Sequence, residues 1–368
     1  MSSRCASSRA PSARRSRDQR LQDALTTLQE RYGPRSIRLG VDFFDLSARR
    51  GDGADDADRP LTTGSLGLDL IATGLPRGGI TEYAGIDGAG KESLALAALA
   101  TCQRSGGEAL LVDADNAGDF DALAAAGVNL DALVLACPTT AAEAWHILTA
   151  VSAADTLDLV VLFSLSALLG FPDSGWGARR LPHHLTRLVT TLRHSRTAVL
   201  LTNHPVQAPE VAPREAALGQ ERPWRTAGGD AIAQAARLRV ACEPAGVRMT
   251  AWGDLAAMRT VVTVVKHRGQ AHAPHLSLEI GPAGPDHSAE LVALGLSTGC
   301  LREMALGLVL DDTVLGRSVE RAAVALAAQP DLADALERRI RAAWGMTPRT
   351  RATGRVGRTE PTGHAGLR

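Results

Sequence analysis

The chain has 368 residues, enough for one large domain and a smaller accessory domain. Lys+Arg and Asp+Glu are 40 each, so the formal net charge of +0 neither indicates nor excludes a nucleic-acid partner, because local patches decide that. No apolar run reaches the ~18 residues that a membrane span requires, and we therefore expect no membrane partner.

The five cysteines are scattered along the chain without a CxxC pair, a pattern typical of reduced thiols in a cytoplasmic protein. The first twenty residues are rich in Ser and Arg and almost free of acids. Two interpretations of this start remain open, a disordered basic tail over 1–18 or an organelle transit peptide. We take the tail, and with it a cytoplasmic location, as the expectation.

The pattern over residues 19–60 predicts an N-terminal helix, a strand and an acidic linker. Apolar residues fall at helical spacing over 21–32, and Gly33 and Pro34 then end the helix. The linker 51–60 is rich in Asp and Gly.

The main α/β region spans 61–282, where apolar runs alternate with Ala- and Leu-rich helical patterns. The runs are GGITEYAG (78–85), EALLVDAD (108–115), ALVLAC (132–137), LDLVVLFS (157–164) and TAVLLTNH (197–204). This alternation predicts a mostly parallel sheet covered on both faces. Residues 283–346 show short helical patterns and little strand signal, which predicts a small helical domain. The tail 347–368 shows no apolar periodicity and is expected to be disordered.

One motif predicts a specific chemical function. It is a phosphate-binding loop between a strand-like run and a helical run. It comprises Gly85, Asp87, Gly88, Ala89, Gly90, Lys91, Glu92 and Ser93. Glycines let the backbone approach phosphate oxygens, the helix N-terminus favours an anion, and Lys91 adds a charge, so the motif predicts ATP binding. The position after Lys91 normally holds the hydroxyl that ligates Mg²⁺, but here it is Glu92. Mg²⁺ binding is therefore uncertain, with Glu92 as the one candidate metal ligand.

The residues around this loop resemble the bacterial RecA recombinase family. The resemblance begins with LQDALTTLQERYGPRSIRLG (21–40), is strongest in LTTGSLGLDLIATGLPRGGITEYAGIDGAGKES (61–93), and continues through LLTNHP, RTAGGDAIAQAARLRV and VVTVVKHRG to ELVALGLSTGCLREMA (290–305). It implies an α/β fold, with a RecA-type P-loop core, a mostly parallel sheet, an N-terminal helix that packs on the next protomer, and a small C-terminal α-rich domain.

The resemblance also implies roles at the nucleotide site. Asp115 matches the acid that orients the attacking water, His204 matches the sensor of the γ-phosphate, and Asp119 matches the acid that binds adenine. Lys266 and Arg268 match cations that reach the phosphate of a neighbouring protomer. The family's metal-holding aspartate falls on Phe163, whose ring cannot hold water or metal.

Two segments correspond to the family's loops for single-stranded DNA. Their candidate contacts are Trp176, Arg179, Arg180 and Arg187 in the first, and Arg222, Trp224, Arg225, Gly228 and Gly229 in the second. Basic groups neutralise phosphates and aromatic rings stack on bases.

Three functions remain open at this point. The leading hypothesis is a RecA-like protein of recombination and repair that binds ATP and single-stranded DNA, forms filaments or rings, and hydrolyses ATP weakly or not at all. In this case it would act alone or with an active RecA. The second is a fully active DNA-dependent ATPase and strand-exchange enzyme. The third is a non-enzymatic accessory factor for a translesion polymerase, against which the retained Lys91 argues.

Overall fold

The computed structural model describes residues 59–115, 119–170, 177–206, 225–249, 255–267 and 274–345. The chain divides into two compact units, 1–59 and 60–368, and the description below concerns the second. The predicted tails 1–18 and 347–368 and the predicted helix 21–32 lie outside the described residues.

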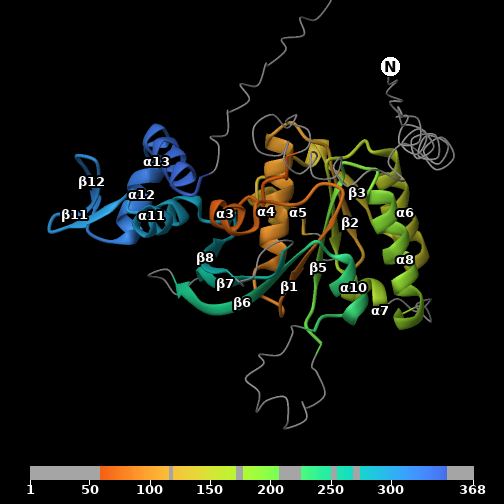
Figure 1. Cartoon of the computed structure of the whole chain (residues 1–368). Coiled ribbons are helices and arrows are strands. Elements are labelled where there is room, and N and C mark those ends of the chain that lie inside the picture. Colours follow the sequence, from red (N-terminus) through yellow and green to blue (C-terminus); the bar gives the residue numbers. More distant parts are fainter. Residues whose placement is uncertain are drawn as a thin grey trace, which may run out of the picture. The chain divides into compact units, whose positions relative to one another are not determined.

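A large sheet forms the centre of this unit (Figure 1). Its strand order, within the described residues, is β3-β2-β4-β5-β1-β6-β7-β8-β9. The strands that pair in parallel are β1 (Ile80–Ala84), β2 (Ala109–Asp113), β3 (Val134–Ala136), β4 (Leu159–Phe163), β5 (Ala198–Asn203) and the start of β6 (Leu238–Met249). The antiparallel extension is β7 (Leu255–His267), β8 (His275–Gly281) and β9 (Gly284–Pro285). Each of the five apolar runs forms a strand, so the predicted mostly parallel sheet is confirmed.

Helices cover both faces of the parallel strands. One face packs against α3 (Leu66–Ala72), α4 (Lys91–Arg104) and α5 (Phe120–Ala125), and the other against α6 (Ala141–Ala154), α7 (Leu165–Gly170), α8 (Gly177–Leu192) and α10 (Gly229–Ala235). In β4, Val161 and Phe163 enter the first core cluster while Leu162 enters the second. A strand buried on both faces needs apolar residues at every position, which explains the unbroken run LVVLF.

The C-terminal region contains both helices and short strands. Its elements are α11 (His287–Ser297), β10 (Arg302–Met304), β11 (Gly307–Leu310), β12 (Thr313–Gly316), α12 (Val319–Ala327) and α13 (Pro330–Ala343). Their apolar side chains form a third core cluster together with Leu66 and Leu70 of α3. The expectation of little strand over 283–346 was wrong for β10 to β12, because strands of 3 or 4 residues are too short to show a period of two. None of the described helices has the length and hydropathy that crossing a bilayer requires.

Candidate functional site

The phosphate-binding loop lies where the sequence predicts it, between the carboxyl end of β1 and the first residue of α4. Two glycines of this loop have no room for a side chain. Gly90 has φ +84°, and a Cβ there would lie 2.6 Å from Cδ1 of Ile280. A Cβ on Gly85 would lie 2.6 Å from the carbonyl oxygen of Cys242. No side chain caps α4, so its first N–H groups are left for an anion.

Lys91 is fully buried, and carboxylates of its own loop surround its ammonium group. Its Nζ lies 2.7 Å from Oε1 of Glu92 and 3.7 Å from Oδ1 of Asp87. It also donates to the carbonyl oxygen of Ile86 at 3.3 Å. The main cation of the loop is therefore already neutralised by the protein.

His204 follows β5 and reaches the same loop. Its Nε2 lies 2.6 Å from Oδ1 of Asp87, and its Nδ1 lies 2.7 Å from Oγ of Ser166. The Ser166 hydroxyl is 2.9 Å from that of Ser164. The hydrogen bond from His204, followed by the charges of His204 and Lys91, lowers the pKa of Asp87, so Asp87 is a carboxylate at neutral pH. The predicted phosphate sensor and the P-loop are thus in direct contact.

The side chains at the expected Mg²⁺ position do not suit the ion. Glu92, the candidate ligand, makes an ion pair with Lys91, and Phe163 is packed in the core with 3% of its surface exposed. The described residues contain no group of three or more His, Cys, Asp or Glu side chains arranged to hold a metal. Hard cations such as Mg²⁺ require oxygen ligands, and the ring of Phe163 offers none.

Asp115 and Asp119 flank residues 116–118, which lie outside the described part. Asp115 is exposed just beyond the end of β2, at the sheet edge that also carries the P-loop. Asp119 is the N-cap of α5 and accepts a hydrogen bond from the Asp121 amide at 2.9 Å. Their roles in orienting water and in binding adenine remain predictions.

Lys266 is on β7, and its ammonium group donates to carbonyl oxygens at the end of α10. The acceptors are Ala233 at 2.7 Å, Gln234 at 3.2 Å and Ala236 at 2.6 Å. A lysine has three donors, so Lys266 would have to leave this helix end to reach a phosphate on another protomer. Arg268 lies outside the described residues.

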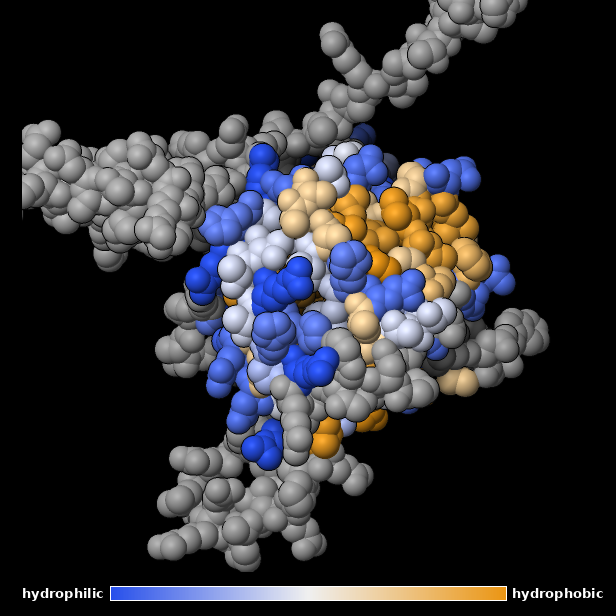
Figure 2. Space-filling model, turned by 90° about the vertical axis from the view of Figure 1, so that its right-hand side faces the viewer, coloured by the Kyte–Doolittle hydropathy of each residue, from blue (hydrophilic) through white to orange (hydrophobic). Residues whose placement is uncertain are grey.

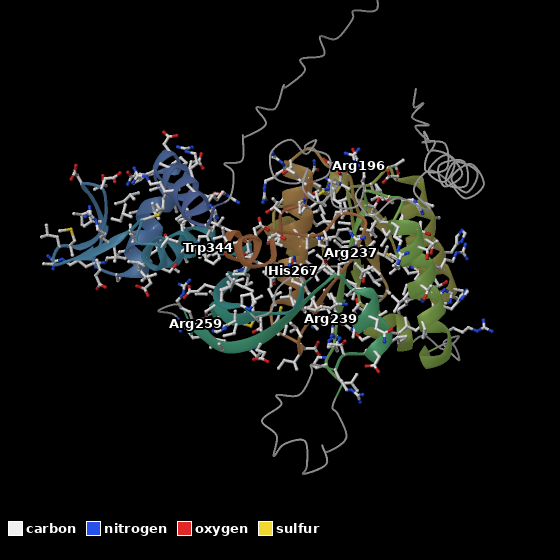
Figure 3. All side chains as sticks on the ribbon, viewed as in Figure 1. Arg196, Arg237, Arg239, Arg259, His267 and Trp344 are labelled. Carbon is white, nitrogen blue, oxygen red and sulfur yellow. The ribbon has the colours of Figure 1, made fainter. Side chains whose placement is uncertain are left out.

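A buried polar network at the end of β5 was missed by the sequence analysis. Glu82 of β1 is fully buried and pairs with Arg239 of β6. Arg239 is labelled in Figure 3. It also accepts hydrogen bonds from Asn203 at 2.7 Å and Thr226 at 2.6 Å. The signal that could have revealed it is a charged residue within the strand GGITEYAG, since buried charges are nearly always paired.

This network holds the two ends of the second predicted DNA segment together. The amide of Ala227 donates to the His204 carbonyl at 3.0 Å, and the amide of Val206 donates to the Arg225 carbonyl at 2.9 Å. Trp176, Arg222 and Trp224 lie outside the described residues, as does the side chain of Arg179. The structure therefore describes only the base of this segment and its backbone hydrogen bond to His204.

The two predicted DNA segments meet at Gly228. This residue has φ +90°, and a Cβ on it would lie 2.8 Å from Cδ2 of Leu181 on α8. Gly229 follows with φ +50°. On α8, Arg180 and Arg187 are exposed, and the sequence from 177 to 196 contains no acidic residue. A basic helix face therefore adjoins the exit of the second segment.

The comparisons with known proteins agree with this architecture. The family model for the RecA N-terminal domain matches residues 19–280. Protein RecA of Acidothermus cellulolyticus is 29% identical over 352 residues, which cover 91% of this chain and 96% of that protein. Protein RecA of Oleidesulfovibrio alaskensis is 27% identical over 342 residues, with 90% and 93% covered. The chain, with its P-loop at the end of β1, belongs to the RecA family.

Proposed function

We propose that this protein is a RecA-like factor of recombination and repair that binds ATP and single-stranded DNA, assembles into filaments, and hydrolyses ATP weakly or not at all. One observation carries the proposal: the P-loop backbone and Lys91 are kept, while Glu92 and Phe163 replace the groups that would hold the metal. Binding and turnover are thereby separated, because binding needs the loop and turnover also needs the metal.

Weak hydrolysis follows from where Phe163 and Glu92 lie. Phosphoryl transfer requires neutralisation of the charge that develops on the leaving phosphates. Phe163 places a buried apolar ring at the end of β4, where it can hold no charge, and Glu92 adds a negative charge beside Lys91. We expect turnover at least ~100-fold below that of an active family member, which corresponds to roughly 2.7 kcal/mol of lost transition-state stabilisation.

Binding to single-stranded DNA is supported by the basic face of α8 and by the position of Gly228 against Leu181. Arg180 and Arg187 are exposed on this helix, and its residue Leu181 adjoins Gly228 at the end of the second predicted DNA segment. Exposed cations at this spacing can neutralise successive phosphates.

Self-assembly is supported by the edge strand β3. The face of the core seen in Figure 2 carries a hydrophobic area. Among the described residues, exposed apolar side chains on or just before β3 are Leu130 at 39%, Val134 at 49% and Leu135 at 38%. An exposed edge strand with apolar side chains is a template for a strand from another chain. The predicted strand that follows helix 21–32 is the proposed occupant, supplied by a neighbouring protomer.

The decisive experiment measures binding and turnover on the same protein. A fluorescent ATP analogue should bind the wild type, and Lys91→Ala should abolish that binding by removing the buried cation. ATP hydrolysis should stay near background with and without single-stranded DNA. Equal binding by the wild type and Lys91→Ala would contradict the nucleotide site. Vigorous DNA-stimulated hydrolysis would instead identify an active strand-exchange ATPase.

Binding assays distinguish between the remaining candidate protein partners. Co-assembly with an active RecA on single-stranded DNA is the outcome expected for a filament component of the cytoplasm. Retention of a translesion polymerase, without any nucleotide dependence, would instead favour the accessory role.

A further inference from the structure

Asp87 occupies an unusual place among the charged groups of the P-loop. Its Oδ1 lies 2.6 Å from Nε2 of His204 and 3.7 Å from Nζ of Lys91. These are the two groups that the phosphates of ATP would meet, one through the P-loop lysine and the other through the sensor position. A carboxylate of the protein thus stands where a phosphate oxygen would form the same contacts.

We propose that Asp87 is an intramolecular competitor of the γ-phosphate of ATP. Asp87 hydrogen-bonds His204 while the site is empty or contains ADP, and it releases His204 only when ATP binds. The inference rests on nucleotide binding by the P-loop, as proposed above. It makes Asp87 the residue that determines how strongly this site discriminates between ATP and ADP.

Both ring nitrogens of His204 are engaged. An ionised carboxylate only accepts, so Nε2 of His204 donates to Asp87. Nδ1 is held by the hydroxyl of Ser166, which lies 2.9 Å from that of Ser164. Nε2 is therefore the ring donor that faces the loop, and Asp87 uses it. A γ-phosphate can be sensed through this donor only after Asp87 has left.

Asp87 is placed so that it can leave. Its side chain is 93% exposed, so a released carboxylate is hydrated at once. The next residue, Gly88, has φ +71°, and a Cβ there would have no atom within 4 Å, so the loop tip has open space around it. Glu92, in contrast, is on the first turn of α4 and 38% exposed, and its contact with Lys91 does not involve His204.

The consequence differs between the two nucleotides. ADP has no γ-phosphate and leaves the contact between Asp87 and His204 intact. ATP brings a second anion to the same donor, so its binding must break the exposed hydrogen bond between His204 and Asp87 and overcome repulsion from the carboxylate. Such exposed contacts are each worth up to about 1 kcal/mol, equivalent to a factor of about five. Removing the charge of Asp87 should tighten ATP binding by roughly 3- to 10-fold and change ADP binding by less than about twofold.

The test is competitive binding of ATP and ADP to the full chain, using a fluorescent nucleotide as the probe, for the wild type, Asp87→Asn and Asp87→Ala. Asp312→Asn removes an exposed carboxylate from the C-terminal region and serves as the control. The expected result is a higher ratio of ATP to ADP affinity in both Asp87 variants and an unchanged ratio in the control. Adding His204→Ala to Asp87→Ala should cancel the gain for ATP, because the competition acts through that ring.

The outcomes separate this inference from the proposed function. If both nucleotides bind and the Asp87 variants leave the affinity ratio unchanged, or weaken ATP and ADP equally, Asp87 only shapes the loop and the competitor role is wrong. A gain for ATP that survives His204→Ala overturns the route through His204. If neither the wild type nor any variant binds ATP, nucleotide binding itself is wrong, and the competitor role is lost with it.

Discussion

Glu92 shows how one residue can change the electrostatics of a P-loop without changing its fold. Its Oε1 lies 2.7 Å from Nζ of Lys91, while the backbone of the loop keeps its glycine geometry. We expect Glu92→Gln to release Lys91 for phosphate and to tighten both ATP and ADP by a similar factor of about 3 to 10, since Lys91 reaches the β-phosphate that both carry. Isothermal titration with each nucleotide checks this. A gain confined to ATP would assign Glu92 the role proposed for Asp87.

At the same scale, the pair of Glu82 and Arg239 is expected to stabilise the base of the second predicted DNA segment. Both side chains are buried, so removing the cation leaves an uncompensated charge inside the sheet. Arg239→Met should lower the free energy of unfolding by about 3–5 kcal/mol. Arg259→Met is the matched control, because Arg259 is 60% exposed and 3.6 Å from Glu279, and it should cost less than about 1 kcal/mol. Urea denaturation measures both, and similar losses would contradict a special role for the buried pair.

At the scale of elements, Glu290 joins the C-terminal region to the core. It lies on α11 and accepts hydrogen bonds from the hydroxyl of Ser65 and from the amides of Leu66 at 3.2 Å and Gly67 at 3.3 Å, at the start of α3. Burial raises its pKa from 4.5 to about 7, against the lowering effect of these hydrogen bonds and of His287. The strength of the contact between α3 and α11 should therefore vary with pH.

The sign of this pH dependence follows from the direction of the shift. The folded protein holds the Glu290 proton more tightly than the unfolded chain, so the contribution is complete below pH 4.5 and is lost as the pH rises to about 7. The full difference is about 3 kcal/mol. Glu290→Gln should remove it, so the difference in unfolding free energy between wild type and variant should change between pH 4.5 and 8. A constant difference across that range would contradict the shifted pKa. His287 on α11, with Glu337 and Arg341 on α13, are the neighbouring charges common to both proteins.

The helix α8 carries a prediction about DNA. Arg180→Ala combined with Arg187→Ala removes two exposed cations from a helix without acidic residues. The slope of log affinity for single-stranded DNA against log salt should become shallower by about 1.4 units, at ~0.7 per lost phosphate contact. Arg104→Ala with Arg302→Ala, on α4 and β10, removes the same charge elsewhere and should leave the slope nearly unchanged. Equal effects of the two pairs would indicate non-specific attraction only.

At the scale of the whole molecule, assembly should depend on the unit 1–59 and on the edge strand β3. Deleting residues 1–33 should leave a folded monomer, because the described core clusters lie within 60–368. Val134→Lys, on the exposed edge, should weaken assembly in the full chain without lowering stability by more than about 0.5 kcal/mol. Sedimentation velocity measures both, and filaments that persist in either protein would contradict the corresponding contact.

Much of the candidate nucleotide site was predictable because it is local. Glycine spacing beside a strand and a helix predicts the P-loop, and the structure places this segment between β1 and α4. His204 was placed by resemblance at the end of β5, and the structure brings it to the loop. The contact of Asp87 with His204 was not predictable, because nothing near Asp87 in the sequence indicates a partner 117 residues away. Lys266 was likewise assigned to a phosphate, whereas the structure places its donors on the end of α10.

The sequence by itself determined the parallel strands, the helices between them and the phosphate-binding loop, because periodicity and glycine spacing act over a few residues. Only the tertiary structure decided which charges meet. Glu82 and Arg239 are 157 residues apart, and Ser65 and Glu290 are 225 apart. No periodicity in the sequence marks such pairs, since each pair forms only when the fold brings two distant segments to the same sheet edge or helix end. Burial then fixes their strength, because a charge removed from water must find a partner in the fold.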